Sequence, residues 1–128
     1  FTKNERIQIV DTEFPYYAVQ HGKVMLGFHH GHLKKITDLP TYFSSEPRYR
    51  EMWGECKKTY IHTGHYHHQE VIETGGATVE RHPTLASADA YAARHGYISD
   101  RACKQITYHR RHGEYKRQSF YPEMLLED

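Results

Sequence analysis

The chain has 128 residues, enough for one domain that buries its own hydrophobic core. Seventeen Lys and Arg against sixteen Asp and Glu leave a net charge of +1, which argues against nucleic-acid binding through bulk positive charge. No apolar run approaches the roughly 18 residues of a membrane span, so no membrane partner is expected. Eleven Tyr, five Phe and one Trp argue against a disordered chain.

The organisation indicates one continuous unit over residues 1–128, without internal repeats, low-complexity tracts or Pro/Ser-rich linkers. Cys56 and Cys103 are too few for a disulfide framework and form no CxxC motif, so two reduced thiols in a cytoplasmic protein are expected. The first residues have no features of a signal peptide. A chain that opens on Phe1 indicates a processed product or a piece of a longer protein.

In chain order, the first expected element is a short strand over residues 7–10. A hairpin follows, with strands over residues 16–20 and 23–28 joined at His21-Gly22. The apolar run Val24–Phe28 is typical of a strand buried on both faces. Asp38 is the expected N-cap of a helix over residues 39–53, with Pro40 in its first turn and Pro47 dividing it.

The second half of the chain is richer in strands. A strand over residues 57–62 is expected to end at Thr63-Gly64, before a hairpin whose strands, residues 67–73 and 77–81, flank Gly75-Gly76. Further along come a helix over residues 88–95, capped by Ser87 and Gly96, and a last hairpin of residues 104–109 and 114–120. The pattern predicts a strand-rich α/β fold with two or three helices.

Two histidine clusters stand out among the twelve histidines, and each directly follows an expected strand. His30-Gly31-His32 comes just after the expected strand over residues 23–28. Gly64-His65-Tyr66-His67 comes just after the expected strand over residues 57–62. A helix-length segment lies between them, so the two strands are expected to be parallel, with their carboxyl ends at one sheet edge. The clusters would therefore converge, and Gly31 and Gly64 would let the backbone turn sharply beside a ligand.

Imidazole nitrogens suit borderline transition metals such as Zn, Mn, Fe and Ni. A structural zinc site is less well supported, because no cysteines stand at zinc-finger spacing. His65 and His67 are two residues apart, so in an extended backbone they can address two different ions.

The two clusters together resemble the last two motifs of the calcineurin-like metallophosphoesterases: a strand that closes on His-Gly-His, followed after one helix by Gly-His-x-His. The resemblance covers roughly residues 23–68, and residues 82–90 resemble phage-encoded members of that superfamily. It implies the carboxyl-terminal half of a layered αββα sandwich, a cytoplasmic protein (in the host cytoplasm if phage-encoded), and hydrolysis of a phosphomonoester or phosphodiester, a nuclease being one version.

The resemblance also implies a site with two divalent metal ions (Mn, Zn, Fe or Ni). His30 and His65 would bind one ion and His67 the other, while His32 would face the phosphate. Such ions activate a bridging water that attacks phosphorus and stabilise the attacking and leaving oxygens.

The chain departs from the family in its carboxylates. Members begin with Asp-x-His, Gly-Asp and Gly-Asn-His motifs, and none of the five Asp here stands in such a motif. We therefore expect the carboxyl-terminal part of a longer enzyme, inactive alone, that needs its amino-terminal half or a partner chain.

Other candidate residues carry more than one interpretation. Lys34, Arg110, Arg111 and Lys116 could contact phosphate or nucleic acid, or could be solvated. His62 is expected to pack within its strand, with a general-acid role left open. The remaining histidines are expected to be structural, solvated or hydrogen-bonded: His21, His29, His68, His82, His95, His109 and His112. The alternative function is a non-catalytic nucleic-acid-binding or regulatory module whose histidines are structural or hold one zinc ion.

Overall fold

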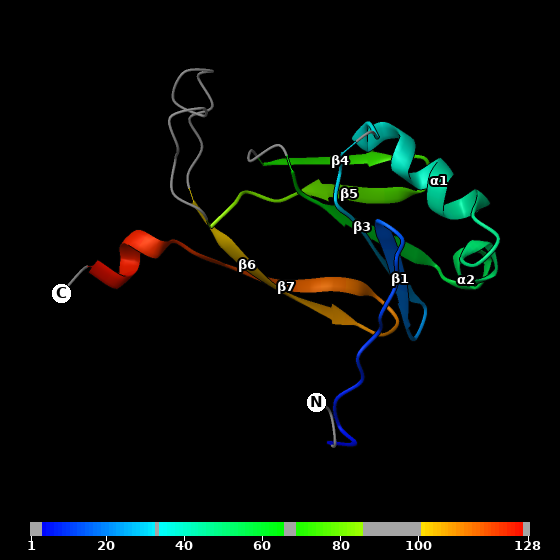
Figure 1. Ribbon diagram of the computed structural model, residues 1–128, viewed down its shortest axis with the longest axis horizontal. Helices are drawn as coiled ribbons and strands as arrows, with labels where there is room; N and C mark the ends of the chain where they lie inside the picture. Colours follow the sequence, from blue (N-terminus) through cyan, green and yellow to red (C-terminus); the bar gives the residue numbers. More distant parts are fainter. Residues whose placement is uncertain (1–3, 33, 66–68, 86–100, 127–128) are drawn as a thin grey trace.

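The computed structural model describes residues 4–32, 34–65, 69–85 and 101–126. A five-stranded mixed sheet and a two-stranded sheet form its framework (Figure 1). The first sheet has the order β1-β2-β3-β5-β4, with strands β1 (Tyr16–His21), β2 (Val24–His29), β3 (Lys58–Thr63), β4 (Glu70–Thr74) and β5 (Ala77–Arg81). The second sheet is the hairpin of β6 (Cys103–His109) and β7 (Gly113–Phe120).

The expected crossover unit is confirmed: β2 and β3 are parallel, and the helices α1 (Leu39–Ser45) and α2 (Arg50–Glu55) lie between them in the chain. Short 3₁₀ turns precede α1 at Ile36–Asp38 and follow β7 at Pro122–Leu126. The register pairs the last residues of β2 and β3 with each other, so both strands end at the same edge of the sheet.

The hydrophobic core lies between the sheet and the two helices. Phe43 and Leu39 of α1 are fully buried, as are Met25 and Ile61 of the strands beneath them. A β-carbon at Gly27 would lie only 3.2 Å from the Phe43 ring, so the glycine makes room for that ring on β2. Burial of such large apolar side chains is the main term that stabilises the domain.

The β6–β7 hairpin covers part of the opposite face of the sheet. The Tyr60 and Tyr108 ring centroids lie 4.9 Å apart, and the Glu114 backbone N–H donates to the Tyr60 hydroxyl at 3.0 Å. On β1 and β2, Val19 and Phe28 remain about 40% exposed. The prediction that the Val24–Phe28 strand is buried on both faces is therefore wrong at its carboxyl end, because nothing in the described part of the chain covers Phe28 fully.

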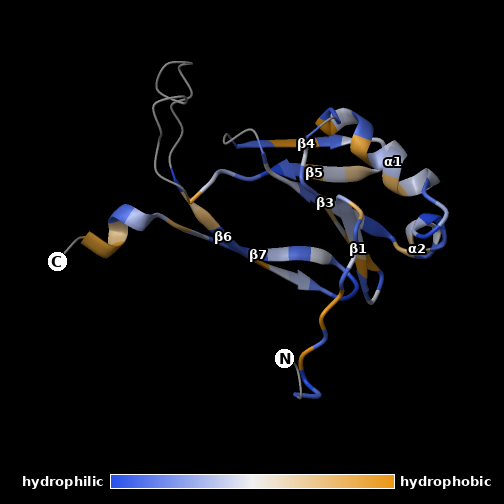
Figure 2. Cartoon of the chain, in the orientation of Figure 1, coloured by the Kyte–Doolittle hydropathy of each residue, from blue (hydrophilic) through white to orange (hydrophobic). Residues whose placement is uncertain are grey.

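The three expected hairpins are confirmed, with ends shifted by up to three residues. The strand over residues 7–10 was wrong: this segment extends from the sheet without a pairing strand, and its apolar side chains are exposed (orange near the N-terminus in Figure 2). Pro47 divides the expected helix, since α1 ends at Ser45 and α2 begins at Arg50. Asp38 makes no side-chain capping bond. The helix over residues 88–95 lies outside the described residues.

No helix in the described ranges has the length and apolar character needed to cross a membrane.

Phe43→Ala should lower the free energy of unfolding by about 3–5 kcal/mol, because it leaves a ring-sized cavity between α1 and β2. Urea unfolding followed by circular dichroism measures the change. Phe120→Ala is the matched control, because Phe120 is 41% exposed and should lose less than 1 kcal/mol, about the scale of a surface substitution. Equal losses in both variants would contradict this placement of the core.

Candidate metal centre

His30 and His65 meet at the edge where β2 and β3 end, as the crossover predicts. The His30 Nε2 and His65 Nδ1 atoms lie 3.0 Å apart, and the two ring centroids 4.9 Å. The Gly64 backbone N–H donates to the His30 carbonyl at 3.3 Å, which holds the two loops together. Both histidines are exposed to solvent.

His32 completes what we call the edge group, His30, His32 and His65. Its ring centroid lies 5.0 Å from that of His30 and 6.2 Å from that of His65. The His32 Nδ1 atom is buried and has no hydrogen-bond partner among the described residues. A buried polar atom without a partner costs about 1–3 kcal/mol, so this nitrogen is suited to a ligand atom.

Gly31 has the role expected of it. Its φ of +100° lies in the region that favours glycine, and a β-carbon there would lie 2.4 Å from the Thr63 Oγ1 atom. The expectation for Gly64 was wrong: its φ is not positive, and a β-carbon there would meet nothing within 4 Å.

The unusual backbone lies one residue later, at His65. Among the described residues other than glycine, only His65 has a positive φ, at 77°. This conformation is uncommon for a residue with a β-carbon and tends to occur at functional sites, where the surroundings hold it. Here it accompanies the approach of the His65 ring to His30.

No carboxylate joins the edge group in the described part of the chain, and its three histidines do not bring ligand atoms all within 4.8 Å of one another. His67 and His68 lie outside the described residues. The edge group is therefore a close pair of imidazoles with a third beside it.

The predicted phosphate contacts are not brought together. The Lys34 ammonium lies 4.9 Å from the centroid of the Tyr42 ring. Arg110 and Arg111 lie at the β6–β7 turn, where the Arg110 carbonyl accepts from the Lys23 backbone N–H at 2.7 Å. Lys23 precedes β2, whereas the edge group follows it, so this turn lies at the other end of the sheet. Lys116 belongs to β7 and pairs with Thr107.

His29 has the structural role expected of it. It is buried, and its Nδ1 atom accepts from the Gly31 backbone N–H at 2.8 Å. Its ring is stacked with that of Tyr16 at a centroid distance of 6.4 Å. Burial, followed by the nearby His32, lowers the pKa of His29 and keeps this imidazole neutral.

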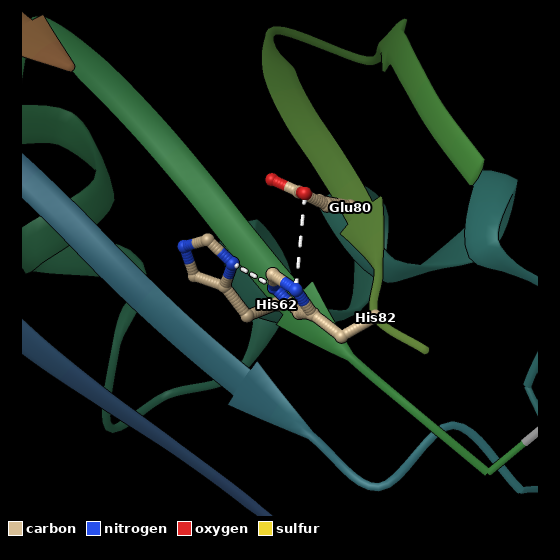
Figure 3. Close-up of side chains that lie close together, drawn as sticks. All are labelled: His62, Glu80 and His82. Atoms are coloured by element: carbon tan, nitrogen blue, oxygen red, sulfur yellow. Dashed lines mark hydrogen bonds and ion pairs between the residues drawn. The ribbon is translucent and has the colours of Figure 1, made fainter. Parts of the chain in front are cut away.

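A second group, His62, Glu80 and His82, has the arrangement of a candidate metal site (Figure 3). One ligand atom from each residue lies within 4.8 Å of the others. His62 Nδ1 is 2.7 Å from His82 Nε2, and His82 Nδ1 is 3.8 Å from Glu80 Oε2. We call these three residues the buried group, since Glu80 has only 3% of its side chain exposed.

Residues of the β6–β7 hairpin hold the buried group in place. The Tyr108 hydroxyl lies 2.5 Å from His62 Nε2, and the Arg117 guanidinium donates to both Glu80 oxygens at 2.6 and 2.7 Å. A second carboxylate, Glu114, accepts from Arg117 at 2.6 Å. The buried group therefore links the sheet to the hairpin.

Burial sets the protonation of these side chains. Burial and then the neighbouring His82 lower the pKa of His62 to about 4, and burial also lowers the pKa of His82. Burial opposes ionisation of Glu80, but the hydrogen bonds from Arg117 and the nearby positive charge together hold the pKa of Glu80 below its usual range. At neutral pH the group thus presents two neutral imidazoles and one carboxylate, all able to bind a metal ion.

The sequence reasoning missed this group. His82 was assigned only a solvated or hydrogen-bonded role, and Glu80 none. The signal is the parallel pairing of β3 with β5, which places His62 opposite Glu80. That register cannot be read from the spacing of the two residues alone.

One open groove of about 380 Å³ is lined by histidines of both groups. His30 of the edge group lines this groove, as do His62 and His82 of the buried group. Phe28 of β2 and Tyr17 of β1 also line it.

Comparison of the chain with known proteins finds no matching family model, no matching curated protein and no matching solved structure.

Gly31→Ala should destabilise the chain by about 1–3 kcal/mol, because alanine at this φ is strained and its β-carbon overlaps the Thr63 hydroxyl. Gly64→Ala is the control, with open space at its β-carbon and little expected loss. Thermal unfolding of both variants measures the difference, and equal midpoints would contradict the close approach.

Stability should fall as the pH drops from 6.5 towards 4 in the presence of a chelator. The unfolded chain binds a proton at His62 near pH 6.5, whereas the folded chain resists it until about pH 4. The free energy of unfolding is therefore highest above pH 6.5 and falls between pH 6.5 and about 4. The loss should reach up to about 3 kcal/mol.

The measurement is the free energy of unfolding in urea against pH for the wild type and for His62→Phe, which keeps an aromatic ring on the strand. The variant should lose less stability on acidification. Identical pH profiles would show that His62 is not held neutral by its surroundings.

Proposed function

We propose that this chain supplies histidine ligands to a dinuclear metal centre that hydrolyses phosphoesters, as the carboxyl-terminal part of a calcineurin-like metallophosphoesterase. The observation that carries this proposal is the 3.0 Å approach of His30 Nε2 to His65 Nδ1 at one sheet edge. The two residues come from clusters 35 positions apart, and only the parallel crossover unit brings them together.

The donor set fits a transition metal ion. Two imidazole nitrogens bound to one tetrahedral ion at about 2.0–2.1 Å stand roughly 3.3–3.4 Å apart. The observed 3.0 Å is close enough that a small ring rotation admits an ion. The positive φ of His65 supports the same interpretation, because strained backbone is characteristic of ligand sites.

Divalent ions, when bound, activate water as a nucleophile and stabilise the charge on a phosphoryl group. His30 and His65 would hold one ion and His67 the other. His32 would orient the phosphate, since its buried Nδ1 atom can donate to or accept from a substrate oxygen. Three neutral imidazoles leave the charge of the two ions uncompensated, so this chain alone should bind metal weakly and hydrolyse little.

The remaining ligands would be carboxylates from outside residues 1–128, in an amino-terminal half or a partner chain. The uncovered face of β1 and β2, with Val19 and Phe28 exposed, is where a second sheet would complete the αββα sandwich. The substrate class is a phosphomonoester or a phosphodiester. Contact of Arg110, Arg111 and Lys116 with nucleic acid stays a prediction, for a surface remote from the edge group.

A second candidate function is a non-catalytic module that holds a single ion. The buried group favours it, because His62, Glu80 and His82 form a three-residue donor set without a partner chain.

Calorimetric titration of the chain with Mn²⁺ and Zn²⁺ tests the edge group. The binding event assigned to the edge group should weaken at least tenfold in His30→Ala/His65→Ala/His67→Ala, because the variant removes every imidazole assigned to the two ions, whereas an ion held by the buried group should remain. The matched control is His109→Ala/His112→Ala, which removes two stacked histidines whose ring centroids lie 4.6 Å apart, away from the edge group. Equal binding by the triple variant and the wild type would overturn the ligand assignment.

The enzymatic part of the proposal requires Asp-x-His, Gly-Asp and Gly-Asn-His motifs, encoded upstream in the same reading frame or in a partner. Joined to that segment, the chain should hydrolyse bis(4-nitrophenyl) phosphate or 4-nitrophenyl phosphate in the presence of Mn²⁺, and alone it should not. A start codon directly before Phe1 and no such partner would favour the single-ion module.

A further inference from the structure

We propose that the buried group binds a transition metal ion of its own, of the Zn²⁺ or Co²⁺ class, that fastens the β6–β7 hairpin to the five-stranded sheet. His62 Nδ1 and His82 Nε2 bind the ion directly, and Glu80 compensates its charge and orients His82. This site deepens the single-ion candidate above and is independent of the proposed dinuclear centre, because it shares no ligand with the edge group.

In the metal-free chain, one proton must lie between the two imidazoles, because their facing nitrogens are only 2.7 Å apart. The donors along this chain of side chains all point in one direction. Tyr108 donates to His62 Nε2, His62 Nδ1 donates to His82 Nε2, and His82 Nδ1–H points towards Glu80 Oε2. The last step is 3.8 Å, too long for a good hydrogen bond, so the final donor is poorly satisfied.

A metal ion can replace the proton between the two rings. The nitrogens then have to separate by roughly 0.6–0.7 Å to reach the spacing of two ligands on a tetrahedral ion. His62 changes tautomer: its single ring proton moves through solvent from Nδ1 to Nε2, where it is donated to the Tyr108 oxygen, and Nδ1 becomes free for the ion with no net release of a proton. Both rings stay neutral, as burial already favours.

The Glu80 carboxylate is positioned to accept a hydrogen bond from His82 when His82 binds the ion. Arg117 occupies one lone pair on each carboxylate oxygen, which leaves further lone pairs for the His82 side. A carboxylate that accepts the distal N–H of a ligating histidine fixes the ring and raises its basicity. Widening the space between the imidazoles moves the His82 ring, and the 3.8 Å gap to Glu80 leaves room for that movement.

The remaining coordination positions open onto the groove that His62 and His82 line together with His30. Tyr108 of β6 and Arg117 of β7 contact the ligand and its carboxylate, so an ion here tightens the hairpin against β3 and β5. The expected consequence is a metal-dependent gain in stability.

The experiment is a Co²⁺ titration of the full chain after chelation, followed by visible absorption, in two double variants. His30→Ala/His65→Ala removes the edge pair and should keep one equivalent with the intense bands of four-coordinate Co²⁺. His62→Phe/His82→Phe preserves the stacked rings but removes their nitrogens, and should lose that equivalent. Loss in the edge variant, or survival in the buried-group variant, would overturn the proposal.

A second measurement needs no change in the buried group and so does not depend on the folding of that variant. In His30→Ala/His65→Ala, Zn²⁺ at 100 times its Kd should raise the unfolding free energy by about 2.7 kcal/mol. Imidazole ¹⁵N NMR should show His62 Nδ1 and His82 Nε2 shifting with the metal. Unchanged imidazole signals would mean that the buried group is only a network of hydrogen bonds, which would overturn this proposal. The edge-group proposal would not be affected by that result.

Discussion

The parallel pairing of β2 with β3 is the constraint on which both histidine groups depend. It aligns the carboxyl ends of the two strands, so that the loops after them carry His30 and His65 to within hydrogen-bond distance. The same sheet continues to β5, whose parallel register places Glu80 opposite His62 on the face turned away from the helices. A slip of one residue along β3 would move His62 to the other face, away from Glu80.

The two groups are adapted to different tasks by their surroundings. His30 and His65 are exposed, and no carboxylate among the described residues joins the edge group. The buried group has its own carboxylate, held by Arg117, and its histidines are kept neutral by burial. An exposed, incomplete donor set suits ions exchanged with substrate and partner, whereas a buried and locally compensated set suits a resident ion.

Much of the fold could be predicted from local signals, because turn glycines and alternating apolar residues act over short distances. The hairpins around Gly22 and Gly75 and the strand–helix–strand unit follow from them. The prediction of a strand over residues 7–10 was wrong, because a strand needs a neighbouring strand to pair with, and local alternation of apolar residues does not show whether one is present. His30 and His65 were found through their clusters, but the buried group depends on the register between β3 and β5, and on contacts from Tyr108 and Arg117.

Anomalous X-ray diffraction would show whether His30 and His65 bind a metal ion. Crystals of the chain soaked in millimolar Mn²⁺ and measured at a wavelength with strong manganese signal would locate each ion without reference to activity. We expect an anomalous peak at a ligand distance of about 2.0–2.3 Å from both His30 Nε2 and His65 Nδ1. A map with no peak at these two nitrogens, while both rings remain ordered and accessible, would contradict it.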